Sequence, residues 1–249
     1  MIMKEEFQKA MLIGMYLSKY DKRALKILGF ESFVEAYNTI GLAINAKPLS
    51  IRNYRDEFDP VFPNKRKGWH KRPMFRTRVE MLNKYSDLGL EAFTDLVKTI
   101  IYQNPAINLI EEKIESEEDK SRTFAKRLIT GQAAEQYFRD NYQLVPDFQG
   151  LIFEETTQFG CGFDFRVLHD TGFYAIEVKG LERAKGAIGL TDKEYRVASY
   201  LKEKYFVFLV RNFIDTPVYN LFKNPVFSQE LDFVKNERTI KQVSWNASV

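Results

Sequence analysis

Two short β-rich runs carry the residues whose types and spacing could do chemistry. Asp164 lies in the first run, thirteen residues before Glu177, and the second run places Glu177 and Lys179 two positions apart. Because successive side chains of a strand point to opposite faces, Glu177 and Lys179 share one face. Turn-forming residues 169–172 separate the runs, and a hairpin there would bring Asp164 beside the other two. We therefore expect two carboxylates and one ammonium group on one patch of sheet.

Hydrolysis of a phosphodiester needs such a trio. Two acids can hold a hard divalent cation, usually magnesium, through oxygen ligands and leave positions open for water. The metal polarises the phosphoryl oxygen and lowers the pKa of bound water. The lysine positions or activates the attacking water and balances charge in the transition state. The alternative is a cross-strand ion pair on a solvent-facing sheet.

The surroundings of the trio resemble a known family. Asp164 followed by Ile-Glu-Val-Lys-Gly at 176–180 resembles the PD-(D/E)xK motif of restriction-endonuclease-like nucleases, with Phe163 in place of the motif's proline. Gly-Gln-Ala-Ala-Glu at 131–135 and Leu-Thr-Asp-Lys-Glu at 190–194 extend the resemblance to the NO VEIN carboxy-terminal-like branch of that superfamily. It covers about residues 122–222.

The resemblance implies a magnesium-dependent endodeoxyribonuclease. Its predicted catalytic residues are Asp164, Glu177, Lys179 and Glu135, and its predicted metal-binding residues are Asp164, Glu177 and Val178. Mg²⁺ is the expected cofactor.

Two further acids have competing interpretations. Glu135 shares a helix face with apolar residues, where an unpaired acid is costly, and the resemblance implies that it is a third acid near the metal. Alternatively, it pairs with Arg139 at i+4 on the helix surface. Glu194 follows Thr191 by three residues, which is the spacing of a capping box. We favour this structural role and leave Glu194 out of the catalytic set.

The C-terminal half is predicted to be an α/β domain, an α+β mixed sheet flanked by helices with a restriction-endonuclease-like core. Alternation along the first catalytic run is expected to place Phe163, Phe165 and Val167 on its apolar face. The expected helices span about residues 122–142 and 191–204, and the expected strands span 151–155, 162–168, 173–179, 205–213 and 218–222.

The N-terminal half is predicted to be mainly helical, with a plain or winged helix-turn-helix. Helical periodicity runs through residues 5–46, Pro48 ends it, and Ser50 is expected to cap a helix over 51–58. Further helices are expected at about 77–85 and 90–102. The charged stretch 111–121 predicts a boundary between domains 1–110 and 120–249.

Positive charge is concentrated in residues 47–78. The segment holds ten Lys and Arg and three acids, so it carries +7 while the rest of the chain carries −4. Such a block favours a polyanionic partner, although a merely solvated face is the alternative. Residues 50–60 with the following Gly-Trp also resemble an amino-terminal DNA-recognition module of some bacterial restriction enzymes. The predicted DNA-binding residues are Arg52, Asn53, Arg55, Lys65, Arg66, Lys67, Trp69, Lys71, Arg72 and Arg76.

Together these features predict a type II-like restriction endonuclease that cuts double-stranded DNA, expected to be a homodimer because a duplex has two strands to cut. The alternatives are a defence or repair nuclease acting on modified or damaged DNA, and a DNA-binding regulator with an inactive nuclease fold.

One cysteine excludes a disulfide framework and a zinc ribbon. The early acids and the short apolar run argue against a signal peptide or membrane span, so we expect a cytoplasmic protein without membrane contact.

Overall fold

The computed structural model describes residues 4–66, 68, 73–102 and 118–236 of the 249-residue chain. In its N-terminal part, the described residues form helices and turns and no strand, so they contain no β wing. The elements are α1 (Glu5–Leu28), α2 (Phe33–Ala43), α3 (Pro48–Phe58), the short 3-10 helix η1 (Asp59–Val61), α4 (Arg76–Tyr85) and α5 (Leu90–Tyr102).

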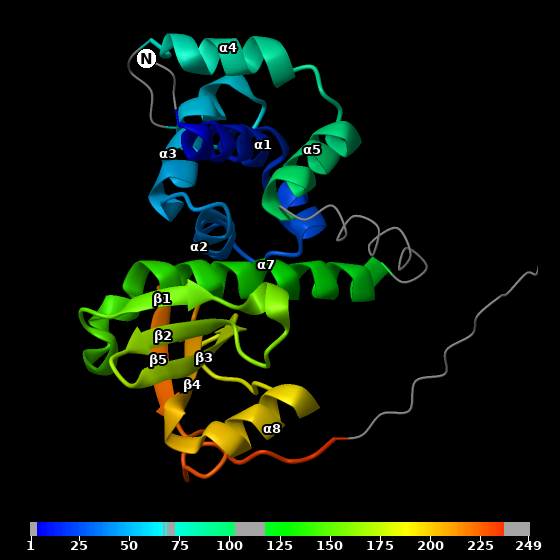
Figure 1. Cartoon of the computed structure of the whole chain (residues 1–249). Coiled ribbons are helices and arrows are strands. Elements are labelled where there is room, and N and C mark those ends of the chain that lie inside the picture. Colours follow the sequence, from blue (N-terminus) through cyan, green and yellow to red (C-terminus); the bar gives the residue numbers. More distant parts are fainter. Residues whose placement is uncertain (1–3, 67, 69–72, 103–117, 237–249) are drawn as a thin grey trace, which may run out of the picture.

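The C-terminal part is a five-stranded mixed sheet with helices on both faces (Figure 1). The strands lie in the order β1-β2-β3-β4-β5, and only β3 and β4 pair in parallel. The predicted α/β class with a helical N-terminal region is thereby confirmed. The elements are α7 (Glu118–Asn141), η2 (Tyr142–Leu144), η3 (Pro146–Phe148), β1 (Ile152–Glu155), η4 (Thr157–Phe159), β2 (Phe165–His169), β3 (Gly172–Leu181), α8 (Asp192–Leu201), η5 (Lys202–Lys204), β4 (Tyr205–Arg211) and β5 (Val218–Lys223).

The two faces of the sheet bury different residues. Alternation along β4 sends Phe206 and Phe208 into the core shared with α7, whereas Tyr205 and Val207 belong to a smaller cluster with Ala198 of α8. The parallel pairing of β3 with β4 requires a crossover, and α8 lies within that connection. This arrangement puts β3 in the middle of the sheet, between the two helical layers.

The N-terminal helices pack on the outer side of α7 (Figure 1). One continuous apolar core runs from α1 through α2 and α7 to the sheet. A charged contact lies in the same interface: Lys126 Nζ of α7 is 2.7 Å from Glu35 Oε1 of α2 and 2.7 Å from Glu182 Oε1, which follows β3. The amide of Asn38 also donates to the carbonyl of Phe213, 2.9 Å away.

Three local predictions were wrong. Ser50 does not cap α3: the helix begins at Pro48, because a proline in the first turn needs no amide hydrogen. The helix expected from about residue 122 begins at Glu118. Phe163 does not share a face with Phe165 and Val167, because β2 begins only at Phe165, and Phe163 packs in the α8 cluster against Phe173.

No helix among the described residues is long and apolar enough to cross a membrane.

Candidate active site

The pairing of β2 with β3 places the predicted catalytic residues side by side. Phe165 pairs with Ile176, so Asp164, directly before β2, lies beside the part of β3 that holds Glu177 and Lys179. The backbone amide of Asp164 donates to the carbonyl of Ile176, 2.9 Å away, and its carboxylate accepts from the Val178 amide, also at 2.9 Å. The expected hairpin therefore forms, and hydrogen bonds to β3 hold both the backbone and the side chain of Asp164.

Lys179 is held between two carboxylates. Its Nζ lies 2.6 Å from Glu177 Oε1 and 2.8 Å from Glu194 Oε2. Although burial alone would lower the pKa of Lys179, these carboxylates raise it above its ordinary value, so the ammonium group stays charged. Burial also opposes ionisation of Glu194, but the hydrogen bonds and charge of Lys179 lower the pKa of that carboxyl. Lys179 and Glu194 therefore form a stable ion pair.

Glu177 is the most buried acid of this cluster, with 4% of its surface exposed. Burial first, and then the neighbouring charge of Asp164, raise the pKa of Glu177 to about 8 despite the nearby Lys179. Burial likewise raises the pKa of Asp164, against the Val178 amide and Lys179, which favour its charged form. Burial and the closeness of the two carboxyl groups thus oppose the ionisation of both at once.

Glu135 approaches this pair from α7. Burial, followed by the charge of Asp164, raises the pKa of Glu135 to about 7. Its Oε2 also lies 3.2 Å from Arg139, whose guanidinium bridges to Glu155 Oε1 at 2.8 Å. The two interpretations of Glu135 are thus compatible: the pair with Arg139 exists, and the carboxyl group is also close enough to Asp164 for that charge to raise the Glu135 pKa.

The donor atoms fit a hard divalent cation. Asp164 and Glu177 offer carboxylate oxygens, and Val178 can contribute its main-chain carbonyl, the donor type that magnesium and calcium prefer. Within the described residues no group of three or more His, Cys, Asp or Glu side chains is placed to hold a metal. A cation here would therefore be bound by two side chains, and backbone oxygen and water would occupy the remaining coordination positions. Bound there, it would supply Lewis-acid chemistry.

Glu194 has a second function that the sequence reasoning missed. The predicted capping box is present: Thr191 accepts from the Glu194 amide, and Glu194 Oε2 accepts from the Thr191 amide at 3.0 Å. The same Oε2 also binds Lys179. A single carboxylate thus fixes the start of α8 and the lysine, and neither local spacing nor helix periodicity could have indicated the second contact.

Two other residues shape the site without having been predicted to do so. A Cβ at Gly180 would meet the carbonyl oxygen of Thr130 at 2.7 Å, so glycine here lets β3 approach α7 closely. Tyr205, fully buried on the α8 face, donates its hydroxyl to the Gly162 carbonyl at 3.0 Å. Burial and the nearby carboxylates, Glu177 first, raise the pKa of this phenol.

Several arginines of the basic segment have structural partners. Arg66 binds Asp59, whose side chain is 1% exposed, at 2.7 Å, and also binds Asp21, where α1 is kinked. Arg55 binds the neighbouring Asp56 and covers the ring of Phe33, 4.5 Å from its centroid. These two predicted DNA-binding side chains therefore hold the helices of the N-terminal region together.

The other predicted DNA-binding residues fall into two groups. Arg52 and Asn53 on α3, Lys65 after it, and Arg76 at the start of α4 are exposed. Lys67, Trp69, Lys71 and Arg72 lie outside the described residues. The exposed group could contact a phosphate backbone without disturbing the packing of the helices.

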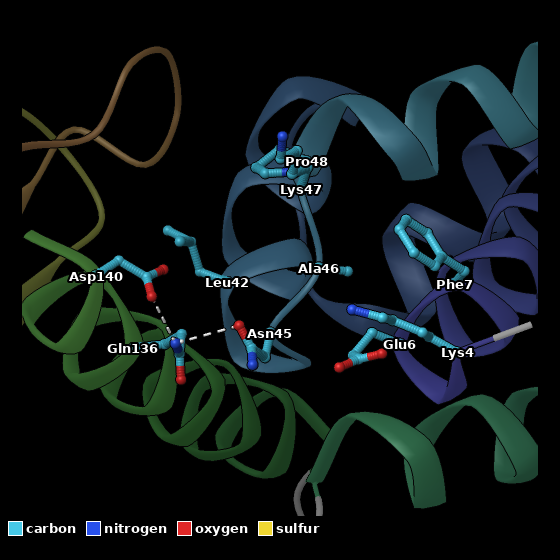
Figure 2. A pocket seen from close by; sticks show the side chains of 10 residues that line it. All are labelled: Lys4, Glu6, Phe7, Leu42, Asn45, Ala46, Lys47, Pro48, Gln136 and Asp140. Carbon is cyan, nitrogen blue, oxygen red and sulfur yellow. Dashed lines mark hydrogen bonds between the residues drawn. The ribbon is translucent and has the colours of Figure 1, made fainter.

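A separate cavity of about 380 Å³ lies between α7 and the N-terminal helices (Figure 2). Gln136 of α7 is one of its lining residues and donates to Asn45 at 3.3 Å and to Asp140 at 2.9 Å. None of the predicted catalytic residues lines this cavity. The lining residues are Lys4, Glu6, Phe7, Leu42, Asn45, Ala46, Lys47, Pro48, Gln136 and Asp140.

Comparison with known proteins supports the predicted resemblance for part of the chain. The family model described as Protein NO VEIN, C-terminal, matches residues 134–222. The match includes Glu135, Asp164, Glu177, Lys179 and Glu194, and it ends within β5. No curated protein and no solved structure matches the chain. Residues 134–222 are thus similar to the NO VEIN C-terminal family.

Proposed function

We propose that the chain is a magnesium-dependent endodeoxyribonuclease whose centre is Asp164, Glu177 and Lys179. The observation that carries the proposal is the juxtaposition of the buried Glu177 and the half-buried Asp164 with a charged lysine 2.6 Å from Glu177. Surface ion pairs contribute little to stability, and burying two acids side by side costs free energy. Such a cluster is better explained by chemistry than by folding.

The residues have distinct chemical roles in this proposal. Asp164 and Glu177, with the main chain of Val178, would hold the cation, which supplies Lewis-acid polarisation of a phosphate oxygen. Lys179, kept protonated by Glu194, places positive charge where negative charge grows during attack on phosphorus. Glu135, with a pKa near neutrality, can accept a proton from water close to Asp164.

The substrate we propose is double-stranded DNA, cut at or near a specific sequence in the manner of a type II restriction endonuclease. The net charge of residues 47–78 supports a polyanionic substrate, and the exposed Arg52 and Asn53 of α3 are suited to base contacts. A homodimer would supply one active site for each strand.

The test is to incubate the purified chain with phage DNA and magnesium and to sequence the fragment ends. Discrete ends at one sequence support a restriction enzyme. Ends that appear only in methylated or damaged DNA support the alternative of a defence or repair nuclease. Asp164→Asn serves as the control for contaminating nucleases, because it removes one metal-binding charge with little change in shape. DNA that stays intact with the parent chain overturns the proposal and favours a DNA-binding regulator.

A further inference from the structure

A groove of about 840 Å³ extends from the candidate active site along α7. Lys179 and Val178 lie at its catalytic end, and Gly29 and Glu31 of the N-terminal region also line it. One wall is α7 and the other is the segment between β3 and α8. Lys126, Arg127, Gly131 and Gly189 also line it.

Three cationic side chains line this groove, and Arg127 is the one without an ion-pair partner among the described residues. Lys126 is held by Glu35 and Glu182, and Lys179 is held by two other carboxylates. Arg127 is exposed, and no carboxylate in the described part of the chain forms an ion pair with it. An unpaired guanidinium at the wall of a groove is suited to binding a phosphate with two parallel hydrogen bonds.

At two glycines, the backbone of the groove walls is accessible because no side chain covers it. A Cβ at Gly131 of α7, or at Gly189 opposite, would meet no heavy atom within 4 Å. Neither glycine has a positive φ, so neither is required by the backbone conformation. Glycine inside a helix is disfavoured relative to alanine, and no packing contact within the described part of the chain requires it at Gly131. A ligand that lies against α7 would require it.

The side of α7 that carries Arg127 and Gly131 continues to the candidate active site. Arg127, Gly131 and Glu135 are spaced at i, i+4 and i+8, so they follow one another along one side of the helix. Arg127 and Glu135 are about 12 Å apart along the axis, from 1.5 Å of rise per residue. Glu135 belongs to the candidate active site, where it pairs with Arg139. A strand lying along this side of the helix would pass from Arg127 over Gly131 to the catalytic acids.

We propose that this groove seats the sugar-phosphate backbone of the DNA strand that is cut. Arg127 contacts a phosphate next to the scissile one, and Gly131 lets the backbone lie against the main chain of α7. This inference rests on the proposed nuclease function, and it adds two substrate-binding residues outside the basic segment 47–78.

The test measures binding and stability separately. Affinity of the full chain for a fluorescein-labelled duplex is measured by anisotropy over a range of salt concentrations with calcium in place of magnesium, and Tm is measured in parallel. Arg127→Ala should weaken binding by about tenfold and reduce the dependence of log K on log salt by about 0.9, the value of one phosphate contact. Gly131→Leu should weaken binding similarly, while its Tm stays equal or rises.

Matched controls separate the groove from general effects. Arg196→Ala removes an exposed arginine of α8 that pairs with Asp192, and Gly89→Leu fills open space at a residue that does not line the groove. Both should bind the duplex like the parent chain. If the parent binds and cuts DNA while Arg127→Ala and Gly131→Leu keep its affinity and salt dependence, the groove assignment is overturned alone. If the parent neither binds nor cuts duplex DNA, the proposed function fails and the groove assignment fails with it.

Discussion

Glu177 and Lys179 differ in how their charge is stabilised in the candidate site. Lys179 has two carboxylates within 2.8 Å, and only one of them, Glu194, has a lowered pKa. Glu177 is buried next to Asp164, and its pKa is raised instead. Near neutral pH the cluster therefore keeps one firm ion pair, between Lys179 and Glu194, and Glu177 keeps its proton. A divalent cation would compete with that proton, since a ligand carboxylate must be ionised.

The raised pKa of Glu177 predicts a pH-dependent stability of the metal-free chain. The pKa rises from 4.5 to about 8 on folding, so the folded chain binds this proton more tightly than the unfolded chain does. Stability from this group is fully present below about pH 4.5 and is lost as the pH rises toward 8. Glu177→Gln cannot ionise and should remove this loss, by at most about 5 kcal/mol.

Urea unfolding in the presence of a chelator, at about pH 5 and about pH 8.5, measures the effect. The exposed Glu230→Gln is the matched control and should follow the parent chain. Parent and Glu177→Gln chains that lose stability in parallel over this range would contradict the raised pKa of Glu177.

At the level of elements, Glu194 links the start of α8 to the sheet. Glu194→Gln keeps a side chain that can complete the capping box but removes the negative charge from Lys179. We expect it to lower the cleavage rate while the melting temperature changes little. Thr191→Ala should do the reverse, lowering the unfolding free energy by about 1 kcal/mol through loss of the cap while leaving the Lys179 contact. Equal loss of activity in both variants would show that the cap alone matters.

The basic segment also divides into a structural and an exposed part. Arg66→Ala leaves the buried carboxylate of Asp59 without its ion-pair partner and should lower the unfolding free energy by roughly 3–5 kcal/mol. Arg52→Ala, on the exposed side of α3, should change stability by less than about 0.5 kcal/mol and weaken DNA binding. Denaturant unfolding and duplex affinity distinguish them. A stable Arg66→Ala chain would mean that this arginine is available for DNA.

Sequence patterns predicted those elements whose signals are local. The bounds of α5 were predicted as they occur, the Thr191 cap was predicted from a four-residue spacing, and the neighbourhood of Asp164, Glu177 and Lys179 followed from alternation and one turn. Features that depend on distant partners were not predictable. These include the Lys179–Glu194 pair and the pairing of Arg66 with Asp59 and Asp21, since a charge run alone does not show which members find a carboxylate after folding.

At the level of the whole molecule, the two parts of the chain are joined by more than a linker. A continuous core passes from α1 through α2 and α7 to the sheet, and Lys126 connects α2 to the end of β3. The described residues should therefore unfold as one cooperative unit, with calorimetric and van't Hoff enthalpies that agree. Lys126→Met should lower Tm, because it leaves Glu35, whose side chain is fully buried, without its cationic partner. Two separate transitions in scanning calorimetry would show that the parts unfold independently.

The proposed mechanism requires Lys179 to act in chemistry and not only in an ion pair. The direct measurement is the rate at which the full chain cuts supercoiled plasmid with magnesium, compared between Lys179→Ala and the exposed Lys204→Ala. The account predicts that Lys179→Ala binds the plasmid like the parent but loses at least about 100-fold in rate, the size of one lost electrostatic contact to a transition state, while Lys204→Ala is unaffected. Cleavage by Lys179→Ala at the rate of the parent chain would contradict it.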